Sequence, residues 1–175
     1  ELKAMDAIVT CQGGDYTKQV YDGLRAAGWD GYWIDAASSL RMKDHTIIVL
    51  DPVNRDVIDA ALAEGKKDFI GGNCTVSLMM MALGGLLQND HAEWISAMTY
   101  QAASGAGAKN MKELIAQMDV LGDATKSLIG DPASSALNVD AVVTRELRNQ
   151  DFPTENFGVP LAASIIPWID SAMES

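Results

Sequence analysis

The sequence has few of the residues on which metal sites, disulfide frameworks and nucleic-acid interfaces depend. Among 175 residues it has two cysteines and two histidines, and 13 lysines and arginines stand against 24 aspartates and glutamates. The formal net charge of −11 argues against nucleic acid or an anionic membrane as a partner, although it leaves small anionic ligands open. The longest apolar stretch, residues 76–87, is too short and too rich in glycine to span a bilayer.

Several other signals are also missing. No basic, apolar segment typical of a signal peptide opens the chain, so we expect a cytoplasmic protein. Cys11 and Cys74 fall in different predicted strand–helix units, which predicts no disulfide. His45 and His91 lie in polar, turn-like segments without the ligand spacing of a zinc site, so we expect surface histidines and no metal site. No turn has the G-x-G-x-x-G spacing of a dinucleotide fingerprint.

Residues 1–71 do contain a regular alternation of strands and helices. The predicted strands are 7–10, 32–34, 47–50 and 68–70. The helix after the first strand begins near Asp15 and ends at Gly28, and the helix before the fourth strand ends at Gly65. Alternation at these lengths predicts an α/β fold, with a parallel sheet and helices on its faces.

The elements after residue 71 are predicted from their apolar periodicity. We expect a buried helix at 76–87, a strand at 94–100, a small-residue loop at 101–108, a long helix beginning near Lys109, a turn at 131–135 and a short helix at 139–147. The inner face predicted for the long helix consists of Met111, Leu114, Ile115, Met118 and Leu121. The apolar stretch 161–169 would need a sheet or a partner subunit to cover it.

The turn Gly71-Gly72-Asn73-Cys74 carries the strongest chemical signal. It lies between a predicted strand and a predicted helix, so Cys74 would sit in the first helical turn, where unpaired N–H groups and the helix dipole favour the reactive thiolate. Glycines before it allow a substrate to approach and supply N–H donors to an oxyanion. The alternative is a small buried structural cysteine, because free cysteine is among the most buried residue types.

Five blocks, in this order, carry a resemblance to a known family. They are 10–14 (TCQGG), 32–42 (YWIDAASSLRM), 71–75 (GGNCT), 99–105 (TYQAASG) and 156–161 (NFGVPL). Together they resemble aspartate-semialdehyde dehydrogenases of the type found in Gram-negative bacteria, over essentially the whole sequence. Family members are roughly twice as long, so the resemblance implies an internal fragment that lacks both ends.

The resemblance implies a two-part fold of the glyceraldehyde-phosphate-dehydrogenase-like type. Residues 1–71 would be the later part of a Rossmann-type NADP-binding domain, and residues 72–175 the first part of an α/β catalytic and dimerisation domain. The implied partners are small molecules and a second copy of the chain, which makes a homodimer.

The implied reaction is the NADP-dependent conversion of L-aspartyl-4-phosphate to L-aspartate 4-semialdehyde, with release of phosphate, on the route to lysine, threonine and methionine. By its match to the family motif, Cys74 would be the nucleophile that forms an acyl thioester. Gln101 would orient the substrate, Arg41 would bind phosphate, and Asn73 would support the turn. A guanidinium suits a bidentate phosphate contact, although an arginine in such a loop is commonly only a surface charge.

The cofactor contacts implied by the resemblance are Gln12, Ser104, Gly105, Ala106, Gly107, Ala108 and Pro132. Ala106 departs mildly from the family pattern, in which glycine is common. The family's general-base histidine, a substrate-binding arginine and glutamate, a phosphate-binding lysine and the glycine-rich NADP turn have no match here, and neither His45 nor His91 fits the catalytic histidine's motif. We therefore expect this chain alone to be inactive. The alternatives are a related acyl-phosphate reductase and a non-catalytic folding or assembly module.

Overall fold

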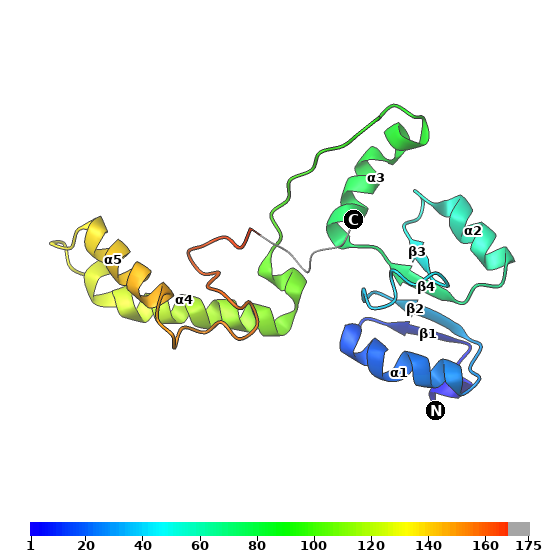
Figure 1. Cartoon of the computed structure of the whole chain (residues 1–175), viewed down its shortest axis with the longest axis horizontal. Coiled ribbons are helices and arrows are strands. Elements are labelled where there is room, and N and C mark those ends of the chain that lie inside the picture. The colour runs from blue at the N-terminus through cyan, green and yellow to red at the C-terminus, as the bar shows by residue number, and fades with distance from the viewer. Residues whose placement is uncertain (168–175) are drawn as a thin grey trace. The chain divides into compact units, whose positions relative to one another are not determined.

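A four-stranded parallel sheet organises the first part of the molecule (Figure 1). The computed structural model describes residues 1–167. The strands are β1 (Ala7–Thr10), β2 (Tyr32–Asp35), β3 (Ile47–Val49) and β4 (Asp68–Gly71), in the order β1-β2-β4-β3. Every pairing is parallel, with Ile8 opposite Trp33 and Ile34 opposite Phe69. The predicted α/β class and the four predicted strands are therefore confirmed.

The helices are α1 (Gly14–Ala26), α2 (Arg55–Ala63), α3 (Cys74–Gln88), α4 (Ala108–Ile129) and α5 (Ala136–Leu147), with short 3-10 turns η1 (Leu2–Ala4) and η2 (Ala103–Ala106). Gly28 and Gly65 follow α1 and α2 with φ of 84° and 77°, which explains why glycine stands just beyond both helices. Among residues 1–167, no helix is both long and apolar enough to cross a bilayer.

One face of the sheet holds the apolar core, which α1 covers. Trp33 and Ile70 are completely buried there, and they form one cluster with Tyr21 and Leu24 of α1. On the opposite face of the sheet Val9 is 71% exposed. Parallel sheets normally bury both faces, and in the described residues this second face is covered only in part: Phe69 of β4, which points away from Ile70, is 6% exposed, and Ala61 of α2 is 4% exposed.

Arg25 joins α1 to the end of the sheet where the strands begin. Its guanidinium lies 2.6 Å from the Asp68 carboxylate and donates to the carbonyls of Trp29 and Gly31. It also lies 4.5 Å from the centre of the Trp29 ring. A mostly buried cation is tolerated because a carboxylate, carbonyls and an aromatic ring surround it. Burial raises the pKa of the neighbouring Tyr21, an effect that the Arg25 hydrogen bond opposes.

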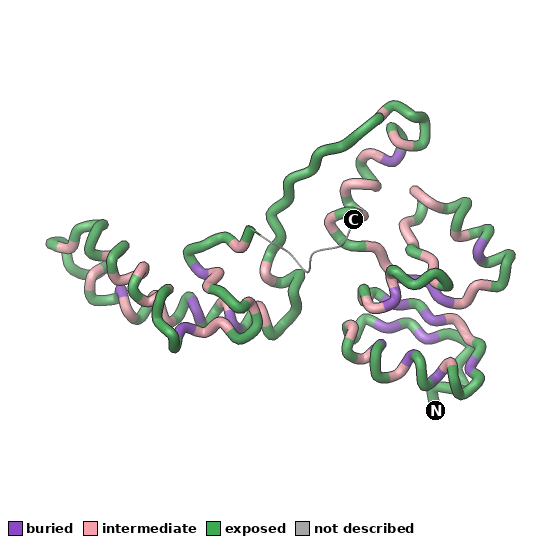
Figure 2. The backbone as a smooth tube through the Cα atoms, viewed as in Figure 1, coloured by how far each residue is buried: buried purple, intermediate pink, exposed green. Residues whose placement is uncertain are grey.

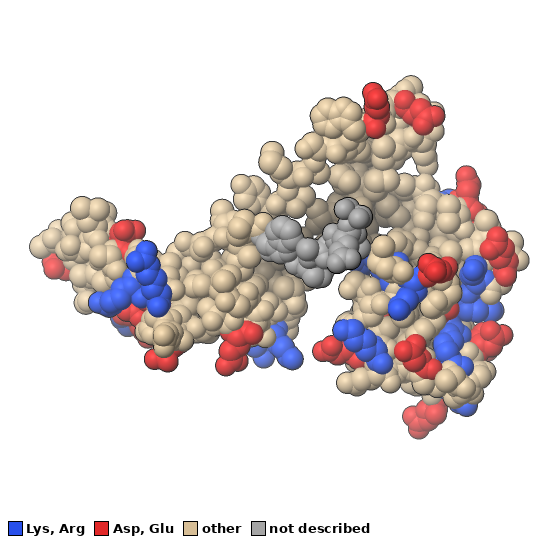
Figure 3. Space-filling view, in the orientation of Figure 1, with Lys and Arg blue, Asp and Glu red and all other residues tan. Residues whose placement is uncertain are grey.

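Two predictions about the segment after β4 are wrong. Helix α3 forms, but it is not buried: Gly84 is its one buried residue, and Leu78 is 73% exposed. The predicted strand at 94–100 is an irregular segment that pairs with no strand among the described residues, and Met98 is 96% exposed. Figure 2 shows α3 as a mixture of exposed and intermediate residues and the irregular segment after it as exposed, and Figure 3 shows few charged side chains over both. Apolar alternation marks a surface that can be buried, but a strand also requires a hydrogen-bonding neighbour.

The chain divides into two compact units, Glu1–Thr99 and Tyr100–Ser175. The first contains the sheet and α1 to α3, and the second contains η2, α4 and α5, with α5 packed against α4. The boundary between these two units, after Thr99, lies later in the chain than the domain boundary predicted after residue 71. The predicted domain boundary stays a prediction. The end of the predicted apolar stretch 161–169 lies outside the described residues.

Within the second unit, the buried positions of α4 are polar, so the predicted apolar inner face is wrong. Glu113, Gln117 and Thr125 are buried, whereas Met111, Ile115 and Met118 are exposed. Leu114 and Leu121 are half-buried. The reason lies in the segment that follows α5, whose backbone packs on α4 and needs hydrogen-bond acceptors there.

Two residues one helical turn apart hold that segment. The Glu113 carboxylate accepts from the backbone N–H of Asn156 at 2.6 Å and of Phe157 at 3.0 Å, and from the Asn156 side-chain amide. The Gln117 side-chain oxygen accepts from the N–H groups of Leu161 and Ala162, both at 2.8 Å, and its amide donates to the Pro153 carbonyl. Side chains on α4 thus supply the partners that a sheet would otherwise supply.

We predict that Glu113→Gln destabilises the second unit, because an amide offers one acceptor oxygen where the carboxylate accepts three hydrogen bonds. The expected loss is about 1–3 kcal/mol, measured as the free energy of urea unfolding. Glu155→Gln removes the same charge from an exposed position of the same segment and should leave stability unchanged. Equal losses in the two variants would contradict the role of the Glu113 hydrogen bonds in holding the segment after α5.

The same contact predicts a pH dependence. Burial raises the pKa of Glu113, but the N–H donors of Asn156 and Phe157 outweigh it, so the folded-state pKa lies below the ordinary value of 4.5. A lowered folded pKa means stabilisation that is complete above the unfolded value and is lost as the pH falls through the folded one. The difference between wild type and Glu113→Gln should therefore shrink in acid below about pH 4. A difference that grows in acid would contradict this sign.

Candidate functional site

The candidate site begins where β4 ends and α3 starts. Cys74 is the first residue of α3, as the strand–turn–helix pattern predicts, and its thiol is exposed. The alternative interpretation of a buried structural cysteine is therefore wrong for the described residues. Asn73 is the N-cap in extended conformation, and its side-chain oxygen accepts from the Val76 N–H at 3.1 Å. That bond satisfies one of the unpaired donors of the first turn.

Contacts with Ser77 fix the other side of this turn. The Ser77 N–H donates to the Asn73 carbonyl at 2.7 Å. A Cβ at Gly72 would come within 2.6 Å of the Ser77 hydroxyl oxygen. A residue with a side chain would therefore displace the hydroxyl, so the close approach of the turn to α3 explains glycine at position 72.

Arg41 reaches this turn from the loop after β2. Its Nε donates to the Gly71 carbonyl at 3.0 Å and its Nη2 to the Gly72 carbonyl at 3.2 Å. The structure thus brings the predicted phosphate-binding arginine to the residues directly before Asn73 and Cys74. A guanidinium has five N–H donors, so these two bonds leave others for an anion.

Sequence reasoning missed Asp35, the buried carboxylate that shapes the loop carrying Arg41. It ends β2 and accepts from the Thr17 hydroxyl at 2.5 Å and from the Ala37 N–H at 2.8 Å. Farther along this loop, the Ser39 hydroxyl donates to the Gly14 carbonyl. The available signal was a carboxylate at the last position of a buried strand, where a buried charge needs hydrogen-bond donors.

Gln12 lies at the same edge of the sheet, because the carboxyl ends of parallel strands face one way. It follows β1, its side chain is exposed, and its N–H donates to the Thr10 hydroxyl at 3.3 Å. Next to it, Gly13 is the N-cap of α1, with φ of 89° and no side-chain cap. Backbone N–H groups at such a helix start suit an anionic group of a ligand.

The other predicted site residues belong to the second unit. Gln101 packs so closely on Gly105 that a Cβ at Gly105 would overlap the Gln101 amide. Gly107 is the N-cap of α4 with φ of 102°. The remaining loop residues Ser104, Ala106 and Ala108 are exposed. Gln101 and the small-residue loop therefore form one local cluster.

Pro132 does not join that cluster. It lies in a turn beyond the C-terminal end of α4, whereas the small-residue loop precedes the N-terminal end. The helix has 22 residues, so its two ends are about 33 Å apart at 1.5 Å per residue. The structure therefore separates two groups of residues that were both predicted to contact the cofactor.

The histidines lie on the surface, as predicted. His45 is exposed and stacks on Tyr21, whose hydroxyl lies 3.1 Å from its Nε2, and His91 is exposed. Within residues 1–167, no group of three or more His, Cys, Asp or Glu residues could hold a metal ion.

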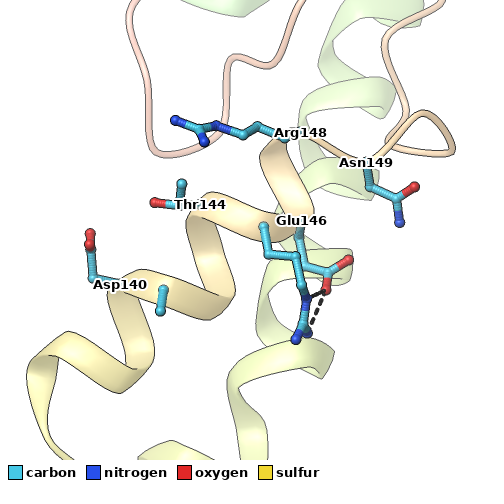
Figure 4. A pocket seen from close by; sticks show the side chains of 7 residues that line it. Asp140, Thr144, Glu146, Arg148 and Asn149 are labelled. Carbon is cyan, nitrogen blue, oxygen red and sulfur yellow. Dashed lines mark hydrogen bonds and ion pairs between the residues drawn. The ribbon is translucent and has the colours of Figure 1, made fainter.

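An open pocket elsewhere on the surface contains none of the predicted site residues (Figure 4). It lies along α5 and the residues just after it, and it is lined by Asp140, Ala141, Thr144, Arg145, Glu146, Arg148 and Asn149. Arg145 forms an ion pair with Glu146 at 2.8 Å. The candidate site is thus defined by the turn geometry around Cys74 and not by a cavity.

Comparison with solved structures finds many similar chains, and three of them illustrate the likeness. Aspartate semialdehyde dehydrogenase from Francisella tularensis is 45% identical, with a TM-score of 0.86, and the match covers 98% of this chain and 46% of that one. Two structures of aspartate semialdehyde dehydrogenase II from Vibrio cholerae, one complexed with ASA, are 24% and 23% identical with TM-scores of 0.66, and the matches cover 99% of this chain and 43% of each. At that identity the latter two show the fold alone. The chain spans less than half the length of these structures.

Family models match both parts of the sequence. The model described as the semialdehyde dehydrogenase NAD binding domain matches residues 1–61, and the one described as the semialdehyde dehydrogenase dimerisation domain matches residues 83–175. The second match alone spans more than half of the chain. Together with the parallel sheet and the exposed cysteine at the start of α3, these matches establish that the chain belongs to the semialdehyde dehydrogenase family.

Proposed function

We propose that this chain carries the nucleophile site of an aspartate-semialdehyde dehydrogenase. The reaction would convert L-aspartyl-4-phosphate to L-aspartate 4-semialdehyde in lysine, threonine and methionine biosynthesis. The observation that supports it best is the exposed Cys74 at the N-terminus of α3, with the Arg41 guanidinium bonded to the two carbonyls just before Asn73. A nucleophile and a cation beside it are what attack on an acyl phosphate requires.

In the proposed acyl transfer, the Cys74 thiolate attacks the carbonyl carbon of the acyl phosphate. A C–S bond forms, the C–O bond to phosphate breaks, and inorganic phosphate leaves with the bonding electrons. The N–H groups in the first turn of α3 carry partial positive charge and would stabilise negative charge that develops beside Cys74 during the attack. Arg41 would hold the departing phosphate with the donors that the glycine carbonyls do not use. Gln101 would orient the acyl group by hydrogen bonding.

The cofactor in this proposal is NADP, whose reduced form, NADPH, would supply the hydride that reduces the thioester to the aldehyde. The residues present fit part of such a site. The start of α1 has no side-chain cap, Gly13 adopts a positive φ, and Gln12 is exposed beside it. Ser104 to Ala108 would contact the nicotinamide end of the cofactor. The glycine-rich fingerprint does not occur in this sequence, so these residues would form only a portion of the cofactor site.

We further propose that the parent enzyme is a cytoplasmic homodimer. The match of residues 83–175 to a dimerisation-domain model supports the dimer. The apolar face of α3 is consistent with it, because large exposed apolar surfaces commonly mark interaction sites.

A non-catalytic assembly role is a second candidate, favoured by that same exposure. Leu78, Trp94 and Met98 are between 73% and 96% exposed, which is unusual unless a surface is covered in an assembly. An assembly role for this chain is compatible with catalysis by the parent enzyme. Acylation of Cys74 by an acyl phosphate distinguishes the two candidates, because a purely non-catalytic module does not require a reactive thiol.

We predict that the 175-residue chain does not turn over aspartate semialdehyde with NADP and phosphate. The sequence has no histidine in the family's general-base motif and no glycine-rich dinucleotide turn. NADPH absorbance provides the measurement, with the Francisella tularensis enzyme as a positive control. NADPH formation that Cys74→Ser abolishes would contradict the prediction.

We predict that Cys74 nevertheless accepts an acyl group. Incubation with acetyl phosphate, a simple acyl phosphate, should add an acetyl group to the Cys74 peptide at a rate about tenfold above that of Cys11, because Cys74 lies at the helix start that Arg41 approaches, where an anionic acyl phosphate can bind. Mass spectrometry before and after hydroxylamine, which cleaves thioesters, identifies the adduct. Cys11 is also exposed and free, and it serves as the internal control. Equal acylation of the two cysteines would reject the nucleophile assignment.

A further inference from the structure

The loop after β2 and the turn before α3 are connected through one side chain. Arg41 is half-buried, and its Nε and Nη2 each bond one carbonyl, those of Gly71 and Gly72. These are consecutive peptide groups. A single planar guanidinium therefore fixes the orientation of both peptide planes that lead from β4 to Asn73.

Peptide planarity extends this constraint to the donors on the same planes. The carbonyl of one residue and the N–H of the next point in opposite directions across a trans peptide. With the carbonyls of Gly71 and Gly72 held toward Arg41, the N–H groups of Gly72 and Asn73 point away from it. Glycine has no side chain to restrict its torsion angles, so without Arg41 these planes could rotate.

We propose that Arg41 is a positioning residue for Cys74, in addition to any contact with phosphate. Its guanidinium holds the two peptide planes before the N-cap, and so it sets the geometry in which α3 presents the thiol. The importance of this geometry for acyl transfer rests on the proposed function, but the positioning itself does not. Lysine could not replace arginine here, because an ammonium is a point donor and lacks the planar fork.

Three variants separate positioning from charge. Arg41→Met removes both the fork and the charge, and Arg41→Lys keeps the charge but removes the fork. Lys43→Met is the matched control, because Lys43 is exposed in the same loop and its loss changes the net charge equally. Two measurements are made on the full 175-residue chain: amide hydrogen exchange of Val76 and Ser77, whose N–H groups bond Asn73, by NMR, and the pH profile of iodoacetamide alkylation of Cys74, with Cys11 as the internal standard.

The expected result is that Arg41→Met speeds exchange of the Val76 and Ser77 N–H groups, both bonded to Asn73, about tenfold, as local opening becomes easier, and moves the Cys74 alkylation profile relative to that of Cys11. Arg41→Lys should show the faster exchange while its alkylation profile returns toward wild type. Lys43→Met should match wild type in both measurements.

Unchanged exchange in Arg41→Met, or an equal change in Lys43→Met, would overturn the proposal. If Arg41→Met loses its far-UV circular dichroism, Arg41→Lys decides, and exchange identical to wild type then rejects positioning. Neither measurement requires an acyl phosphate. Failure of acetyl transfer with an intact Arg41 effect would therefore reject the proposed function and leave the positioning role standing.

Discussion

The candidate site depends on one constraint, which is that loops at the carboxyl edge of the sheet must satisfy their backbone groups without strand neighbours. Side chains supply those hydrogen-bonding partners, one after another along the edge of the sheet. Asp35 is held by Thr17 of α1 and in turn holds the Ala37 N–H. Arg41, carried by the same loop, then bonds the carbonyls that end β4. The position of Cys74 therefore follows from buried polar contacts at the end of the neighbouring strand, β2.

The second unit uses the same solution in a different setting. The segment after α5 has no strand to pair with among the described residues, and Glu113 and Gln117 accept its N–H groups directly. Such contacts are directional, so they fix a loop in one conformation where apolar packing alone would allow several. In both units, irregular segments are ordered by side chains from regular elements.

This arrangement explains which features the sequence could predict. The strands and α1 to α3 have local signals, such as apolar runs between glycines, and their positions agree with the structure. The place of Cys74 at the start of α3 follows from the same pattern, whereas the pattern left open whether its thiol is exposed or buried. The buried face of α4 could not be predicted, because Glu113 and Gln117 are spaced like residues of a solvated helix face. Their burial depends on a segment some forty residues later.

The exposed apolar surface shows the other limit of sequence reasoning. Residues 74–89 contain no charged side chain, and that composition predicts burial, yet burial requires a covering element that periodicity does not identify. The turn around Cys74 does not share this dependence, since Arg41, Asn73 and Ser77 hold it within the first unit. Presentation of the thiol is thus a local property of this chain. Turnover additionally requires an acid/base group and a complete dinucleotide site, and the sequence supplies neither in the form that the family uses.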